Sequence, residues 1–471
     1  MAAQVRWGTT GGVEEARGGR GRALTRRGAL AVPAAGAAGA LLAAACQPAA
    51  GGGRDATAPE AGADGVVRLQ KMAWGSALEK EAIEQGLEVF HQQQPKVRVE
   101  YLHQPDAYDD KLLALLAAGT APDVFKVGGT LYADYIVAGA LADITDRLKR
   151  DAVLGKPDYF IQPFEQERST FKGKWYGVGS TAQERVLYYN VEVLKQAGVA
   201  PPPVSPDKAW GWSEFQQFAR RLTVRSGDNA ERLGGHWPTG DYGPAVVANG
   251  GKIMDPKTLR FALDQPPAVE AIQRVADLAL KDRVAATPAE QQGGTAVQHL
   301  STGKYAMMLG GNWLLLDLAP LGFAYGAGVL PKQARPATTM SSSTTSVWAN
   351  TKKPDAAWQL FRFLNTDDYQ LPLVRKGLWN PSHTTLLSAS GVKRWLDPKV
   401  HPDGYDQLVT EYMVKFGYAD IPAVGTLKAS AVLNEGLSKV WSGSAAAAAV
   451  LKDTVAQANK VLDDEQARAG K

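Results

Sequence analysis

Beyond an N-terminal leader, the apolar residues of the chain follow two alternating periods, which predict strands and helices in turn. Val67 and Leu69 alternate with polar residues, as in a strand. The segment from Ser76 to Glu79 has the residues of a capping box, which is typical of a helix start. A second strand is expected at 97–101, a second helix at 107–118 and a third strand at 123–127. This order predicts a parallel sheet covered by helices.

The same alternation returns later in the chain and predicts a second α/β lobe. Strands are expected at 186–190 and 305–309, and helices at 213–222, 268–281, 295–301 and 355–364. The C-terminal region is expected to be largely helical and includes an alanine-rich stretch. No repeat of fixed period is present, which disfavours a structural adhesin built from repeated units.

The leader has the layout of a secretory signal peptide. An arginine pair precedes an apolar run over 29–45, and Cys46, the only cysteine of the chain, closes it. The run is shorter than the roughly 20 apolar residues of a membrane-spanning helix. The arginine pair resembles a twin-arginine export signal, and the residues up to Cys46 resemble a bacterial lipobox. We therefore expect a lipoprotein-type signal peptide over 1–45, lipidation of Cys46 and a flexible tether over 46–65.

The net charge of +4 lies in the leader, which has six arginines and two acidic residues. The rest of the chain has equal numbers of basic and acidic residues, so it offers no excess positive charge to a phosphate backbone. A nucleic-acid partner is therefore not expected. The hydrophobic fraction of 45% is typical of a globular protein.

Familiar catalytic and metal-binding motifs are missing. The sequence has no G-x-S-x-G, H-E-x-x-H or G-x-x-x-x-G-K-[ST] segment and no second cysteine, and its histidines are scattered. We expect no catalytic residue, no metal and no cofactor. Eleven of the twelve tryptophans lie after the leader, and they suit a sugar ligand because the apolar face of a pyranose stacks on an indole ring. A secreted carbohydrate-active hydrolase that binds sugars through tryptophans is the alternative.

Several short segments follow one another in a recognisable order. They are GTAPDV at 119–124, GKWYGV at 173–178, LYYN at 187–190, AGV at 197–199, WSEF at 212–215, NGG at 249–251, GKYAM at 303–307, NW at 312–313 and PDAAW at 354–358. Their order and spacing resemble those of the maltose-binding-like extracellular solute-binding proteins of ABC importers. Three serines at 341–343 and the segment Trp379-Asn380-Pro381 depart from the family pattern and are expected to reshape the pocket.

The resemblance implies an α/β periplasmic-binding-protein fold of two lobes, each a mainly parallel sheet flanked by helices, with a ligand cleft that closes by hinge motion. The implied segments are 66–180 and 326–378 for the N-terminal lobe, and 181–325 and 379–471 for the C-terminal lobe. The resemblance also implies a monomeric, lipid-anchored receptor outside the cell membrane that is not an enzyme. It would capture a mono- or oligosaccharide and deliver it to permease subunits served by a separate ATPase.

Candidate ligand-binding residues follow from two arguments. Ligands lie beyond the carboxyl ends of parallel strands, which favours residues after the first and third strands of the first lobe, namely Trp74, Ser76, Thr130 and Tyr132. The resemblance adds Gln183, Arg185, Trp237, Tyr242, Asn312, Trp313, Ser343 and Trp379. Trp313 is expected to be the main stacking platform, and the alternative is a core residue. The residues expected in the core are Trp358, Trp395 and Trp441.

Overall fold

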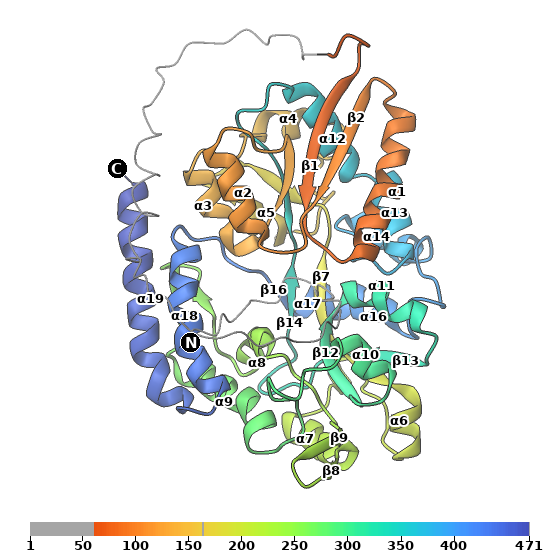
Figure 1. The fold of residues 1–471 in the computed structure, drawn as a ribbon, viewed down its shortest axis with the longest axis vertical. Helices are drawn as coiled ribbons and strands as arrows, with labels where there is room; N and C mark the ends of the chain where they lie inside the picture. Colours follow the sequence, from red (N-terminus) through yellow and green to blue (C-terminus); the bar gives the residue numbers. More distant parts are fainter. Residues whose placement is uncertain (1–60, 163, 471) are drawn as a thin grey trace, which may run out of the picture.

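The computed structural model describes residues 61–162 and 164–470, which form two lobes stacked along the long axis of the molecule (Figure 1). The predicted signal peptide, Cys46 and all but the end of the predicted tether lie outside the described residues. In the described part of the chain, no helix is both long enough and apolar enough to cross a membrane.

The first lobe is built on a five-stranded sheet in the order β2-β1-β3-β15-β6. Its strands are β1 (Val67–Ala73), β2 (Val97–His103), β3 (Val124–Val127), β6 (Gly177–Gly179) and β15 (Thr344–Val347), with a β4 (Thr170–Phe171) and β5 (Lys174–Trp175) hairpin beside them. Its helices are α1 (Ala77–Gln93), α2 (Tyr108–Ala117), α3 (Tyr132–Val137), α4 (Thr145–Arg150), α5 (Phe164–Ser169), α12 (Pro354–Leu364) and α13 (Asp367–Arg375), and the short turn η1 (Gly129–Leu131) precedes α3. β1 pairs in parallel with β2 and β3, as predicted.

The second lobe is centred on β7 (Gln183–Asn190), which pairs with three other strands. The remaining strands of this sheet are β12 (Met307–Gly311), β13 (Tyr325–Gly328), β14 (Thr338–Ser341) and β16 (Gly417–Tyr418), and two hairpins pair β8 (Val224–Ser226) with β9 (Asn229–Arg232) and β10 (Met254–Asp255) with β11 (Arg260–Phe261). The longer helices are α7 (Trp212–Leu222), α9 (Pro266–Leu280), α18 (Thr426–Trp441) and α19 (Ala447–Ala469). Figure 1 shows α18 and α19 side by side along one flank.

Shorter helical segments complete the molecule. They are α6 (Val191–Gln196), η2 (Pro206–Lys208), η3 (Thr239–Asp241), α8 (Gly243–Ala248), α10 (Ala296–Ser301), η4 (Asn312–Leu314), α11 (Leu315–Leu318), η5 (Ala319–Leu321), α14 (Thr384–Leu387), α15 (Ala389–Val392), α16 (Tyr405–Gln407), the π-helix η6 (Leu408–Met413) and α17 (Val414–Phe416).

The predicted helix start at Ser76 is confirmed, since Ser76 Oγ accepts a hydrogen bond from Glu79 N at 3.2 Å.

Strand direction in the second lobe differs from the prediction of a mainly parallel sheet. β12, β13 and β14 all run antiparallel to β7, and β14 is parallel to β16. The reason is the path of the chain: β7 carries it away from the first lobe, and β14 brings it back just before β15. β13 and β14 pair with β7 and so belong to the second sheet, whereas the predicted boundaries assign 326–378 to the first lobe.

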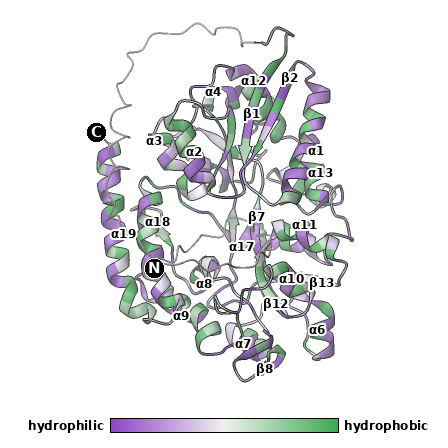
Figure 2. Cartoon of the chain, viewed as in Figure 1, coloured by the Kyte–Doolittle hydropathy of each residue, from purple (hydrophilic) through white to green (hydrophobic). Residues whose placement is uncertain are grey.

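Buried apolar side chains form a core in each lobe. The largest cluster lies in the second lobe and surrounds β7, α7 and α9, and two smaller clusters lie on the two faces of the first sheet. Helices such as α1 and α19 carry both hydrophilic and hydrophobic residues, as expected for helices with one face against a core (Figure 2). Trp395 is fully buried, which confirms it as a core residue.

Candidate functional site

In the described chain, the path between the lobes crosses at three neighbouring places, which are 180–182, 342–343 and 376–383. The first and last crossings are hydrogen-bonded to each other. The backbone N–H of Ala182 donates to Asn380 O, and the N–H of Asn380 donates to Ala182 O, both at 3.0 Å. Gln370 Nε2 adds a bond of 2.7 Å to Ser180 O. The first and last crossings therefore form one hydrogen-bonded unit.

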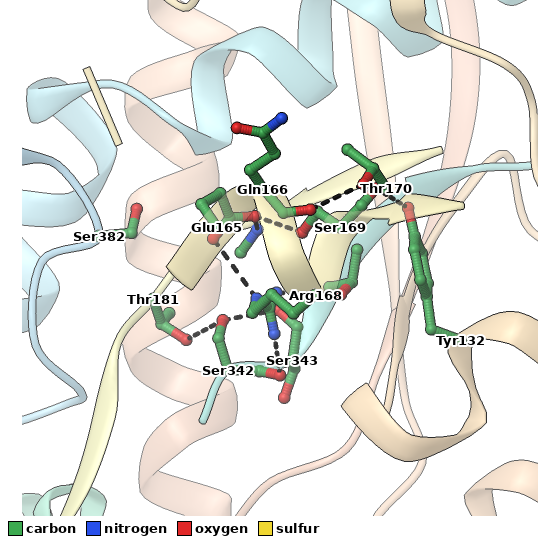
Figure 3. Close-up of polar contacts among 12 residues, drawn as sticks. Tyr132, Glu165, Gln166, Arg168, Ser169, Thr170, Thr181, Ser342, Ser343 and Ser382 are labelled. Atoms are coloured by element: carbon green, nitrogen blue, oxygen red, sulfur yellow. Dashed lines mark hydrogen bonds and ion pairs between the residues drawn. The ribbon is translucent and has the colours of Figure 1, made fainter. Parts of the chain in front are cut away.

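A buried ion pair on α5 holds the first two crossings in place (Figure 3). Arg168 Nη1 donates to Ser342 O at 2.6 Å, and Nη2 donates to Thr344 Oγ1 at 3.0 Å. Glu165 Oε1 accepts from Gly179 N at 2.6 Å, while its Oε2 lies 3.4 Å from Arg168 Nε. Both charged side chains are buried, so each compensates the other in a site that water does not reach.

A pocket of about 720 Å³ opens between the lobes beside these crossings. Thr130 of η1 reaches it from the first lobe. The rest of its wall comes from β7, β10, β11, β14, β16, η3, α8, α18 and the loops beside them. Side chains that line it include Arg185, Asp241, Tyr242, Arg335, Tyr418, Asp420 and Trp441. Aromatic walls with a few polar groups, at this volume, are typical of sites for small organic ligands.

Arg185 forms one wall of this pocket. Its Nε donates to Asp241 Oδ1 at 2.6 Å, and its guanidinium carbon lies 4.4 Å from the centroid of the Trp313 ring. Thr338 Oγ1 donates to the Arg185 carbonyl at 2.7 Å and accepts from its N–H at 3.0 Å, which fixes the backbone. Trp313 is not among the residues that line the pocket, and Arg185 covers one face of its ring.

A second group of charged residues lies where the first lobe meets α11. Lys126 Nζ lies between two indole rings, 4.7 Å from the Trp74 centroid and 4.3 Å from the Trp379 centroid. Burial lowers the pKa of Lys126 and raises the pKa of Glu79, and the nearby Asp317 raises the pKa of Glu79 further. These two tryptophans therefore stack on a cation of the protein itself.

The structure brings six of the predicted ligand-binding residues into two sets. The residues that line the pocket are Thr130, Arg185 and Tyr242. The aromatic residues stacked on protein cations are Trp74, Trp313 and Trp379. The first set presents polar and aromatic groups to the pocket, whereas the second set packs on Lys126 and Arg185.

The other six predicted residues have structural positions. Ser76 caps α1, Gln183 starts β7, and Ser343 is buried in the second crossing. The other three donate hydrogen bonds to backbone carbonyls. These bonds run from Tyr132 OH to Ser169 O at 3.0 Å, from Trp237 Nε1 to Asp241 O at 3.0 Å, and from Asn312 Nδ2 to Ala182 O at 3.1 Å. Contact of these residues with a ligand stays a prediction.

Several pocket residues were not expected from the sequence. They are Asp241, Arg335, Tyr418 and Asp420. Trp441, expected in the core, packs against it but is half-buried and lines the pocket, with its ring 6.1 Å from that of Tyr242. Asp241 directly precedes the predicted residue Tyr242, so its place in the sequence could have suggested it as a pocket residue. No sequence motif marks Asp420. Among the residues that the structure describes, no group of His, Cys, Asp and Glu side chains could hold a metal ion.

The sequence match decides the family. The family model described as bacterial extracellular solute-binding protein matches residues 71–371. The chain belongs to this family. The resemblance noted in the sequence is thereby confirmed.

Relatives and solved structures agree with this assignment. The chain is 30% identical over 293 residues to an uncharacterized lipoprotein from the oleD 5′ region of Streptomyces antibioticus, in a match that covers 57% of this chain and 56% of that one. It is 26% identical over 363 residues to the diacetylchitobiose binding protein DasA of Streptomyces coelicolor, which covers 72% of this chain and 79% of DasA. The chain thus spans little more than half of the first of these relatives.

Two solved structures confirm the two-lobed α/β fold. An ABC substrate-binding protein of Listeria monocytogenes in complex with cycloalternan superposes with a TM-score of 0.75 at 20% identity, covering 84% of this chain and 99% of that one. The maltose-bound MalE3 of T. maritima gives a TM-score of 0.71 at 21% identity, covering 84% and 100%. At this identity the likeness establishes the fold, and the ligand is a separate question.

Proposed function

We propose that this family member is the lipid-anchored, monomeric receptor of an ABC importer, which captures a mono- or oligosaccharide and delivers it to the permease without catalysing a reaction. The observation that carries the proposal is the pocket of about 720 Å³ with wall residues from both lobes. A ligand that contacts both lobes favours their closed arrangement, and that shape is what a permease can recognise. The permease would be served by a separate ATPase.

Carbohydrate is the proposed ligand because the pocket combines aromatic rings with polar groups that have hydroxyl-binding chemistry. Tyr242 and Trp441 offer apolar faces, while Thr130 and Asp420 offer polar atoms. DasA is named for diacetylchitobiose binding, and the two structural relatives hold cycloalternan and maltose. Nothing in these comparisons supports the alternative of a hydrolase.

Sugar binding is expected to raise the melting temperature of the purified protein, because a ligand that binds only the folded state stabilises it. The test is a thermal-shift panel of glucose, maltose, maltotriose, N,N′-diacetylchitobiose and arabinotriose. At least one should raise the midpoint by about 2 to 4 °C at a concentration near 100 times its Kd. Release of shortened sugars during incubation would favour the hydrolase, and a panel with no shift would contradict the proposal.

Membrane attachment is expected to depend on Cys46, because an apolar leader ends there and the chain has no other cysteine. In cell fractionation, the parental protein should sediment with membranes, and Cys46→Ala should move to the soluble extracytoplasmic fraction. Equal thermal shifts for the two proteins would show that the change leaves the lobes intact. A Cys46→Ala protein that stays with the membranes would refute the anchor.

A further inference from the structure

Asp420 lies in the segment between β16 and α18 and lines the pocket between the lobes. It also approaches the first lobe, since a Cβ atom added to Gly129 of η1 would lie 3.8 Å from Asp420 Oδ2. The neighbouring charges that act on its carboxylate are those of Arg185 and Arg168. Asp420 is thus placed where a ligand touching both lobes would pass.

The Asp420 carboxylate has no hydrogen-bond or ion-pair partner within residues 61–162 and 164–470. Arg185 is bonded to Asp241 instead, and Arg168 to Glu165, Ser342 and Thr344. Enclosure in the pocket wall raises the pKa of Asp420, because burial penalises the charged form more than the two arginines favour it. The folded protein therefore holds, in the pocket wall, a carboxylate without a partner among the described residues.

Two hydroxyl groups of the pocket wall also lack a hydrogen-bond partner among the described residues. They are the hydroxyls of Thr130 and Tyr242, which line the pocket. Among the cations of the wall, Lys252 pairs with Asp255 at 2.9 Å and Arg335 Nε donates to Val247 O at 3.3 Å, while Arg185 Nη1 has no hydrogen-bond partner in the described residues. The pocket therefore presents a free acceptor with neutral hydroxyls beside it.

We propose that Asp420 binds the sugar directly, by accepting hydrogen bonds from two adjacent hydroxyl groups. An ionised carboxylate has two acceptor oxygens and no donor, which fits a pair of neighbouring hydroxyls. The inference rests on the proposed function of the pocket as a sugar site.

The test is Asp420→Asn, which keeps the shape and removes the charge. The midpoint of unfolding without sugar should rise by about 1 to 2 °C, because the poorly solvated charge is gone. Affinity for maltose and for N,N′-diacetylchitobiose, measured by calorimetry for whichever binds the parental protein, should fall roughly 10- to 100-fold. A structural carboxylate would give the opposite pattern, with a lower midpoint and unchanged affinity.

Asp403→Asn is the matched control, since Asp403 is an exposed acid of the same half of the chain. It should change neither quantity. Binding by the parental protein with unchanged affinity in Asp420→Asn would overturn this inference alone, whereas a parental protein that binds no sugar would overturn the proposed function and the inference together.

Discussion

Replacing Arg168 by alanine is expected to lower the free energy of unfolding by about 3 to 5 kcal/mol, because it leaves the buried Glu165 carboxylate without its cation. The loss extends to the crossings between the lobes, since Arg168 also donates to Ser342 O and Thr344 Oγ1. Urea denaturation followed by circular dichroism measures the change. The unfolding midpoint in the thermal-shift assay should fall with it.

Two further variants separate this effect from a general effect of removing an arginine. Arg147→Ala breaks a pair with Asp355 whose side chains are 39% and 59% exposed, and it should cost less than about 1 kcal/mol. The double replacement Arg168→Met with Glu165→Gln removes both charges and should recover part of the lost stability. A single Arg168→Ala variant as stable as Arg147→Ala would contradict the assigned role of the ion pair.

The sequence predicted the local elements well because their signals are local. The helix expected at 295–301 is α10 (Ala296–Ser301), and the strand expected at 186–190 is the C-terminal part of β7 (Gln183–Asn190). Hydrophobic period, capping residues and turn glycines act within a few positions of the chain, so they can be recognised without knowledge of the tertiary structure.

The direction of strands in the second sheet could not be obtained in this way. Whether β12 and β14 run with or against β7 depends on where the chain re-enters the lobe, and the apolar pattern of a buried strand is the same in both directions. The parallel prediction was correct for β1, β2 and β3, where consecutive strands are joined by a helix that returns the chain to the same edge.

The pocket shows the same limit. Arg185 and Tyr242 were predicted from segments with recognisable patterns, but Asp420 and Trp441 come from a C-terminal region whose pattern indicated only helix. These residues reach the pocket because α18 packs beside η1 and α9, which is a tertiary contact. Likewise, an aromatic residue near a cleft can face a ligand or a protein cation, and only the structure places Lys126 between Trp74 and Trp379.

Trp313, the predicted stacking platform for the ligand, stacks instead on the guanidinium group of Arg185. The ring packs against Arg185 on one side and against the apolar cluster of the first lobe, although η4 belongs to the second lobe. Gly311 permits this position, since a Cβ atom there would lie 2.2 Å from the indole. Trp313 therefore connects the apolar cluster of the first lobe to a residue of the pocket wall.

Changing Trp313→Ala is expected to weaken binding of maltose, or of whichever panel sugar gives the largest thermal shift, by roughly 100-fold, which is the size of a hot-spot loss. The physical reason is that Arg185 loses the aromatic surface that orients it beside Asp241, and the lobes lose apolar contact in the closed arrangement. Trp358→Ala is the matched control, because Trp358 is also half-buried against the first-lobe cluster but does not line the pocket. Both variants should lose similar stability, so a loss of affinity confined to Trp313→Ala assigns the effect to the site. Equal affinity in the two variants, measured by calorimetry, would show that Trp313 is a packing residue and that Arg185 keeps its orientation through Asp241 alone.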